Sequence, residues 1–397
     1  MPAGRESTRS RLPSLTGMRF LAALLVFVFH AATVFAYPDG DTADTAAGVQ
    51  SVTGRLAFLG VSFFFVLSGF VLTWSARPGD SAGSFLRRRL FKIYPNHLVT
   101  FAVTLILLLV LAKPVTGVLP NLLLVHAWFP DQSIFNSVNV VSWSLSCELV
   151  FYLLFPLLHR WFVRIEGRWL WWWASGVVVA VCCVPLVAEV AIPATGGDPT
   201  QPGSSPAQVW FVFVFPPVAL LQFVLGILMA RIVLARRWIG LPLSAAVTAL
   251  AAGYALALVV PYNFGINATT IVPIALVIAA GAVADVEGRR TLLRGRTMLW
   301  LGEVSFAFYL VHYVVLLEGR ELLGLPRLSA GGEIALLIAG FAVSNALACL
   351  LYLGVERPVM RGWSSPRRPR HRDAPGRTGA PRGHEPVARP PRSPDLR

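Results

Sequence analysis

The chain contains 397 residues, of which 55% are hydrophobic and 14% are charged. Soluble domains carry about 25% charged residues, so this composition argues against a water-soluble enzyme. The formal net charge of +14 would be typical of a nucleic-acid-binding protein if the apolar fraction were ordinary. Long apolar runs favour a membrane protein instead, and we expect no nucleic acid among its partners. The four cysteines lie in apolar stretches without metal-ligand spacing, which argues against a disulfide framework and a zinc site.

Ten apolar runs are long enough to cross a bilayer as helices, which takes about 20 residues each. In chain order they cover residues 16–37, 55–76, 93–112, 138–158, 169–193, 209–231, 241–260, 267–285, 298–317 and 332–354. The sequence therefore predicts an all-α polytopic membrane protein with about ten transmembrane helices. A further apolar stretch, 115–130, is interrupted by Pro120 and Pro130, and we expect it to be a short re-entrant or interfacial segment.

The basic residues are divided unequally between two sets of loops. Twenty-nine Lys and Arg residues lie in one set and four in the opposite set. Because basic loops are retained in the cytoplasm, we expect both termini to be cytoplasmic in a multi-pass protein of the plasma membrane. The predicted parts are an N-terminal segment 1–14, a transmembrane domain 15–356 and a basic Pro/Arg-rich tail 357–397. We expect the tail to be disordered and to contact membrane lipid through its charges.

The first span contains two ionisable residues, Arg19 and His30, within LTGMRFLAALLVFVFH. Eleven residues make three helical turns plus about 20°, so both side chains project from nearly the same face, about 16 Å apart along the axis. This arrangement suits one long ligand with an anionic end near Arg19 and a reactive end near His30. The alternative is that Arg19 is a snorkelling anchor and that His30 packs against a neighbouring helix. For the pair on one face we favour a functional site.

A basic cluster precedes the third span in FLRRRLFKIYPNH and consists of Arg87, Arg88, Arg89 and Lys92. From charge alone, a topology signal or contact with lipid head groups is the simpler interpretation. The functional alternative is a phosphate clamp, because guanidinium groups match phosphate oxygens in bidentate geometry. Arg89 and Lys92 are three residues apart and share a helical face if the helix begins before them.

The fourth span carries a carboxylate, Glu148, in VVSWSLSCELVFYLLFP, close to Trp143 and Ser144. Such a group could orient the imidazole of His30, pair with Arg19 or accept a structural hydrogen bond. The residues alone leave these three alternatives open.

The ninth span carries a polar stripe in LGEVSFAFYLVHYVVL, formed by Ser305, Tyr309 and His312. These three residues lie within about 60° of one another around a helix. The stripe lines a cavity or makes interhelical hydrogen bonds, and both interpretations fit the pattern equally well.

Taken together, these segments resemble the membrane acyltransferase-3 family of bacterial integral-membrane O-acyltransferases. The matching segments are LTGMRFLAALLVFVFH, GVSFFFVLSGFVL, RRRLFKIYP, WSLSCELVFYLLFP, LGEVSFAFYLVH and VERPVMR. They follow the family's order from residue 12 to about residue 361. The chain departs from the family pattern at Thr16, Phe20 and Lys92, where Asp, Gly and Arg are usual. Lys still meets phosphate as a point charge, without bidentate geometry.

The resemblance implies an enzyme that transfers an acyl group to a hydroxyl of a carbohydrate or of a secondary metabolite such as a macrolide. It implies acyl-coenzyme A as co-substrate, with no bound cofactor and no metal. Arg19, Arg89 and Lys92 are the implied donor-binding residues, and the basic cluster adds Arg88 to them. The resemblance leaves the acceptor, the acyl length and the oligomeric state open.

The resemblance also implies that His30 is the catalytic residue. We hypothesise that it acts as general base on the acceptor hydroxyl, with a transient acyl-His intermediate as the alternative. Glu148 is expected to assist it in catalysis by orienting its ring. The expected acceptor cavity is lined by Trp143, Ser144, Tyr309 and His312. The alternative prediction comes from a different class of function. The same ionisable residues within the membrane spans would suit a proton-coupled transporter or flippase of an anionic or glycan-type solute.

Overall fold

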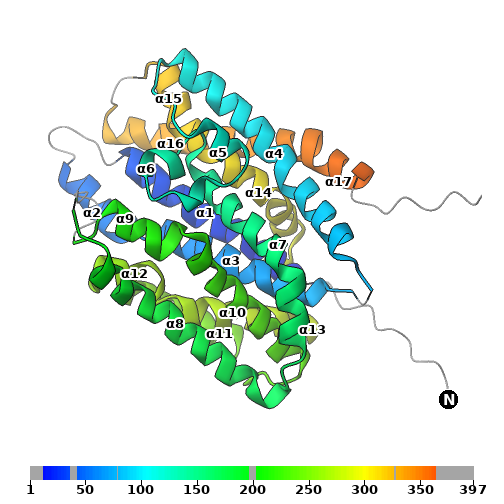
Figure 1. Cartoon of the computed structure of the whole chain (residues 1–397). Coiled ribbons are helices and arrows are strands. Elements are labelled where there is room, and N and C mark those ends of the chain that lie inside the picture. Colours follow the sequence, from blue (N-terminus) through cyan, green and yellow to red (C-terminus); the bar gives the residue numbers. More distant parts are fainter. Residues whose placement is uncertain (1–11, 36–42, 78, 196–202, 326–327, 364–397) are drawn as a thin grey trace, which may run out of the picture. The chain divides into compact units, whose positions relative to one another are not determined.

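The structure is a computed structural model that describes residues 12–35, 43–77, 79–195, 203–325 and 328–363. All regular elements within these residues are helices (Figure 1). Nine helical stretches in this described part are long and apolar enough to cross a membrane, and a tenth apolar helix has 17 residues. The predicted all-α polytopic membrane protein is therefore confirmed, with nine to ten candidate spans at the ten predicted places.

The longer helices have the following bounds. They are α1 (Pro13–Phe35), α2 (Ala43–Thr53), α3 (Leu56–Ser75), α4 (Ala82–Val110), α7 (Trp143–Val163), α8 (Leu170–Ala191), α10 (Pro216–Leu234), α11 (Leu243–Val259), α13 (Ile271–Val286), α14 (Arg296–Leu316) and α16 (Ala330–Leu351). Shorter pieces connect or extend them: α5 (Val118–Leu122), η1 (His126–Trp128), α6 (Gln132–Phe135), η2 (Val140–Ser142), η3 (Gly167–Trp169), α9 (Pro206–Val209), η4 (Trp210–Val214), α12 (Tyr262–Asn267), η5 (Leu292–Arg294), α15 (Glu318–Leu322), η6 (Tyr352–Glu356) and α17 (Arg357–Trp363).

The core is built around α3, whose backbone approaches α10 very closely. A Cβ atom on Gly69 would lie 2.0 Å from the carbonyl oxygen of Phe223, and one on Gly226 would lie 1.9 Å from that of Val66. Only glycine fits at either position, and helices in a membrane commonly use small residues to approach each other in this way. These two glycines therefore fix how α3 and α10 cross.

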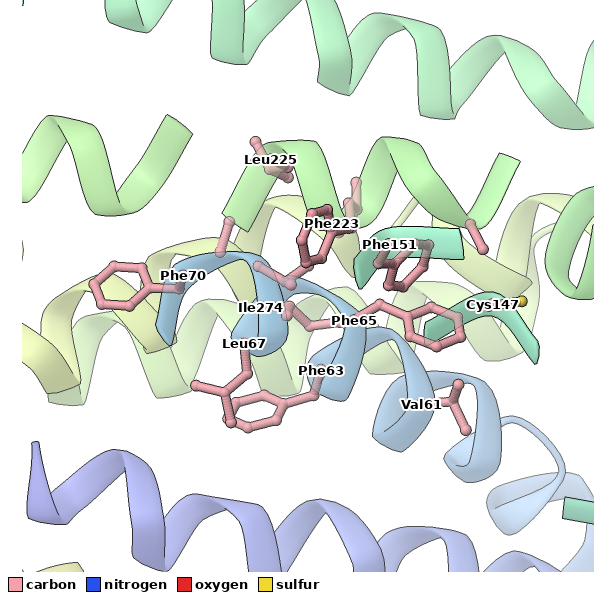
Figure 2. Close-up of a cluster of buried hydrophobic side chains, with 14 of the residues drawn as sticks. Val61, Phe63, Phe65, Leu67, Phe70, Cys147, Phe151, Phe223, Leu225 and Ile274 are labelled. Atoms are coloured by element: carbon pink, nitrogen blue, oxygen red, sulfur yellow. The ribbon is translucent and has the colours of Figure 1, made fainter. Parts of the chain in front are cut away.

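Aromatic side chains fill the space beside this crossing. Figure 2 shows Phe65 of α3, Phe151 of α7 and Phe223 of α10 gathered in one cluster. The rings of Phe65 and Phe151 meet edge-on with centroids 5.1 Å apart, and those of Phe151 and Phe223 stack at 4.7 Å. Offset stacking and edge-to-face contacts are the geometries that aromatic pairs prefer. The cluster holds α7 at a fixed register against α3.

The segment between α4 and α7 folds back against α4 through α5 and η1. The side chains of Asn121 and His126 are fully buried, and Asn121 offers its carbonyl oxygen to the ring of His97 in α4 at 3.1 Å. The stretch 115–130 therefore forms short helical pieces packed beside a long apolar helix, and whether it is re-entrant or interfacial stays a prediction.

Two helix boundaries differ from the predicted ones. Helix α4 begins at Ala82 and runs continuously through Pro95, so the basic cluster lies within the helix instead of before it. Helix α17 continues to Trp363, so the helical region extends beyond the predicted boundary at residue 356. The N-terminal segment up to residue 11 and the tail from residue 364 on lie outside the described residues, as does the expected disorder of the tail.

Candidate active site

Helix α1 carries Arg19 and His30 in one uninterrupted helix, as the sequence predicts. Their helical spacing of eleven residues corresponds to about 16 Å along the axis. Ser14, near the start of α1, anchors the helix to α13, because its backbone N–H and hydroxyl both donate to the carboxylate of Asp285, at 2.8 and 2.7 Å. The position of both ionisable residues is thus set by a helix that is fixed at its first turn.

The imidazole of His30 meets a second imidazole, that of His312 in α14. The Nδ1 atom of His30 lies 3.0 Å from the Nε2 atom of His312, although 282 residues separate the two in sequence. His312 is fully buried, whereas His30 is only partly buried. The ring of Tyr313 lies edge-on to His30 at 4.8 Å and limits its rotation.

With both imidazoles neutral, a backbone carbonyl determines the tautomers of the two rings. The Nδ1 atom of His312 lies 3.2 Å from the carbonyl oxygen of Phe308, which can only accept a hydrogen bond. His312 therefore carries its proton on Nδ1, and its Nε2 lone pair accepts from the Nδ1–H of His30. The remaining nitrogen of His30, Nε2, keeps its lone pair. A partly accessible imidazole with a free lone pair is the geometry of a general base.

A large cavity of about 1150 Å³ lies at the other end of the α1 face, around Arg19. Its ionisable lining residues are Arg19, Arg77, Arg89, Lys92, Glu148 and Glu303. Four basic groups against two acidic ones favour an anionic ligand. The volume lies slightly above the usual range for small-molecule sites, which is about 300–1,000 Å³.

The donor-binding residues that the sequence suggests do not share one environment. Arg19 and Arg89 both line the cavity, and the early start of α4 places Arg89 and Lys92 on one face as expected. Lys92 also lines the cavity, but its ammonium forms an ion pair with the buried carboxylate of Glu356. Arg88 does not reach the cavity, because it forms an ion pair with Asp80 at the helix start. The structure thus separates Arg88 from the three other basic residues of this set, which line the cavity.

Glu148 lies at the Arg19 end of the site and not beside His30. It lines the large cavity, accepts a hydrogen bond from the Tyr152 hydroxyl at 2.7 Å, and interacts electrostatically with Arg19 and Arg89. Of the three alternatives for Glu148, the contact in the described part of the structure is the hydrogen bond from Tyr152, and the carboxylate lies near Arg19 and Arg89 without an ion pair to either. The contact to the His30 ring comes from His312 instead.

None of the four expected acceptor-cavity residues lines the large cavity, and His312 lies at the His30 end. Ser144 and Tyr309 share a hydrogen bond of 2.9 Å, and the Tyr309 hydroxyl also donates to the carbonyl oxygen of Val141 at 3.0 Å. Trp143 packs in the aromatic core, with its ring 5.1 Å from that of Phe213. In the polar stripe of α14, Tyr309 and His312 therefore contact other elements through hydrogen bonds, the second of the two interpretations, whereas the Ser305 hydroxyl donates to Gly302 of its own helix.

Several residues of this region were not anticipated from the sequence. Tyr152 follows Glu148 by four residues, so helical spacing would have identified it as a partner. Glu356 lies in the VERPVMR segment and is buried, and its carboxylate also accepts from Asn96 at 2.6 Å. No local signal connects Glu356 to Lys92, because their contact joins two helices that are far apart in sequence.

The fold and site together define a polytopic membrane protein with a basic cavity at one level and an imidazole pair at another. Residues 12–353 match the family model described as "Acyltransferase domain", and the chain belongs to this acyltransferase family. No solved structure matches the chain.

Three curated relatives bear on the activity. "Acyltransferase MdmB" of Streptomyces mycarofaciens is 44% identical over 363 residues, which cover 88% of this chain and 92% of the relative. "Nodulation protein 10" of Rhizobium leguminosarum bv. viciae is 32% identical over 144 residues, covering 32% of this chain and 38% of the relative. "Peptidoglycan O-acetyltransferase OatA" of Listeria monocytogenes is 27% identical over 168 residues, covering 38% of this chain and 24% of the relative. By homology the chain is a membrane O-acyltransferase, and this favours the enzyme over the transporter alternative.

Proposed function

We propose that the enzyme transfers an acyl group from acyl-coenzyme A to an acceptor hydroxyl, with His30 as general base. The observation that carries the proposal is the His30–His312 pair, which leaves the Nε2 lone pair of His30 free on a partly accessible ring. The basic cavity on the same helix face supports an anionic donor, because the phosphates of coenzyme A need cationic partners.

In the proposed reaction, His30 Nε2 accepts the proton of the acceptor hydroxyl as its oxygen attacks the thioester carbonyl carbon. A C–O bond forms, the C–S bond breaks, and the protonated imidazole returns the proton to the leaving thiolate. His312 supports this cycle as a positioning residue, because its Nε2 accepts from His30 Nδ1–H and keeps that ring in one tautomer. In the alternative with an acyl-His intermediate, the same Nε2 atom attacks the thioester first.

Arg19 and Arg89 are the proposed ligands for the donor phosphates. Both line the cavity with guanidinium groups that suit bidentate contacts, whereas Lys92 shares its charge with Glu356. We assign Glu148 to this donor cavity, where its carboxylate lines the wall beside the basic groups and accepts from the Tyr152 hydroxyl. This replaces the catalytic role at His30 that the sequence suggested for Glu148.

The loop charges support an orientation in which the Arg19 end of α1 faces the cytoplasm, where acyl-coenzyme A is available. Twenty-nine basic residues lie on that side and four on the other, which also supports cytoplasmic termini and residence in the plasma membrane. The acceptor is a hydroxyl of a carbohydrate or of a secondary metabolite such as a macrolide.

Purified protein in lipid nanodiscs tests the proposal without any gradient. We expect consumption of acyl-coenzyme A with formation of an esterified product, and we expect His30→Ala to abolish both. Solute movement that depends on a gradient and yields no ester would contradict the proposal and favour a carrier.

A further inference from the structure

The large cavity ends at one level on every helix that lines it. Toward His30, its last lining residues are Arg19 on α1, Phe64 on α3, Ile93 on α4, Glu148 on α7 and Phe306 on α14. His312 lies six residues beyond Phe306, which is about 9 Å further along α14. A thioester held with its phosphates in the cavity therefore has to pass this level before it reaches the imidazole pair.

Two aromatic rings occupy the space between the cavity and the imidazole pair. The Phe64 ring, which lines the cavity, meets the Tyr309 ring edge-on with centroids 6.0 Å apart. The Tyr309 ring in turn lies 5.9 Å from that of His312, which contacts His30. Phe64 also packs against two separate clusters of buried apolar side chains. The larger includes residues of α3 and α10, and the smaller is formed by residues of α1, α14 and α16 such as Phe27, Phe308 and Leu351, so Phe64 lies where the two clusters meet.

The two rings differ in how firmly they are held. The Tyr309 hydroxyl donates to the carbonyl oxygen of Val141 and shares a hydrogen bond with Ser144, and its side chain is buried. Turning Tyr309 would break these bonds inside the protein, at a cost of about 1–3 kcal/mol for each group left unsatisfied. Phe64 has no polar atom and is only partly buried, so its ring moves without breaking a hydrogen bond. Phe64 is the movable member of the pair.

We propose that Phe64 closes the passage from the donor cavity to His30 and that its bulk restricts the enzyme to short acyl groups. This inference rests on the proposed function, because it takes the cavity as the donor site. When the thioester arm enters, the Phe64 ring turns aside while Tyr309 stays fixed, and the space left beside Tyr309 sets the size of the acyl group that reaches His30. The ring closes the passage again when the donor has left, and the narrow space beside Tyr309 limits the water that reaches a bound thioester.

The test measures acyl-chain selectivity in purified protein in nanodiscs, with acetyl-, butyryl-, hexanoyl- and octanoyl-coenzyme A as donors. We expect Phe64→Ala to raise the ratio of kcat/KM for octanoyl over acetyl transfer by about tenfold or more, because differences of a few methylenes in a pocket are worth about 10- to 200-fold. We also expect it to increase thioester hydrolysis without acceptor. Phe64→Leu keeps an apolar side chain of intermediate size and should give a smaller rise in the same direction.

Phe306→Ala is the matched control, because Phe306 is also a partly buried phenylalanine that lines the cavity at the same level. We expect it to change the rates for all four donors by similar factors and to leave their ratio within about twofold. An unchanged ratio in Phe64→Ala and Phe64→Leu, or an equal rise in Phe306→Ala, would overturn the assignment of Phe64. If the wild-type enzyme consumed none of the four donors, the proposed function itself would fail, and this outcome is distinct from an unchanged ratio.

Discussion

Two groups of buried histidines lie in this protein, and their surroundings differ. His97 and His126 belong to a network in which His97 Nε2 contacts the carbonyl oxygen of Asn121 at 3.1 Å and His126 Nε2 contacts the Ser142 hydroxyl at 3.2 Å. Both rings are fully buried, and the Nδ1 atom of each is enclosed without a partner. The His30–His312 pair instead leaves one ring partly accessible.

This comparison shows that an imidazole buried beside spanning helices does not by itself mark an active site. The His97–His126 network ties the segment 115–130 to α4 and α7, and nothing can approach its nitrogens. The His30–His312 pair lies on a helix face that also carries Arg19 and a cavity for an anion. Access, together with a neighbouring binding site, separates the catalytic candidate from the structural one.

The largest expected effect follows from removing the imidazole of His30. His30→Ala should lower acyl transfer at least 10²- to 10⁴-fold, the usual contribution of a general base. The measurement is transfer of labelled acyl groups by purified protein, with thermal unfolding as the check on folding. A variant that transfers at the parent rate would remove His30 from the mechanism.

A smaller loss should follow from His312→Ala, which takes away the acceptor that holds the His30 ring. Loss of an orienting partner typically costs about 10- to 100-fold, and we expect it in kcat with KM for the donor unchanged. We expect His312→Gln, whose side-chain oxygen can still accept from His30 Nδ1–H, to recover part of the rate. A fall in donor affinity alone would assign His312 to binding instead.

Arg19→Gln should raise KM for acyl-coenzyme A by about tenfold, because a hydrogen bond to a charged group is worth about 1.5–3 kcal/mol. Arg88→Gln is the matched control, since Arg88 pairs with Asp80 outside the cavity and should leave KM unchanged. Steady-state kinetics at fixed ionic strength make the comparison. Equal effects of the two variants would indicate general charge attraction in place of a defined phosphate site.

His126→Ala should affect stability while the reaction continues in the folded molecules. It leaves the Ser142 hydroxyl without its imidazole partner, at an expected cost of about 1–3 kcal/mol in unfolding free energy. Transfer per folded molecule should change less than twofold, which separates this variant clearly from His30→Ala. A catalytic loss as large as that of His30→Ala would abolish the distinction between the two histidine groups.

The smallest expected effect concerns pH. Burial lowers the pKa of His126 to about 3, well below the ordinary value of 6.5. Below about pH 6.5 the His126 side chain therefore binds a proton in the unfolded chain but not in the folded protein. The contribution of the neutral His126 ring to the free energy of unfolding is complete above that pH and declines as the pH falls toward 3. Thermal unfolding measured at pH 7.5 and at pH 5.5 should show that stability decreases less between the two pH values in His126→Ala than in the wild type. Identical losses would show that His126 is not the group responsible.

The sequence predicted much of the fold because the forces that define a membrane span are local. The apolar length of each run gave ten places for helices, and the helical period gave the shared face of Arg19 and His30. Both follow from backbone hydrogen bonds that must be satisfied within each segment. The sequence was less informative about proline: Pro120 and Pro130 suggested interruptions of the stretch 115–130, yet Pro120 lies within the short helix α5, and α4 continues through Pro95.

Only the tertiary structure decided which polar groups meet. The ring of His30 contacts that of His312. Lys92 forms an ion pair with Glu356, and Arg88 forms one with Asp80. Glu148 lines the cavity that also contains Arg19. Most of these partners lie on different helices, and their contacts depend on where the helix backbones cross. The crossing of α3 and α10 is set by the close approach at Gly69 and Gly226. Local periodicity places a side chain on a face of its own helix, but the packing of other helices against that face determines its partner.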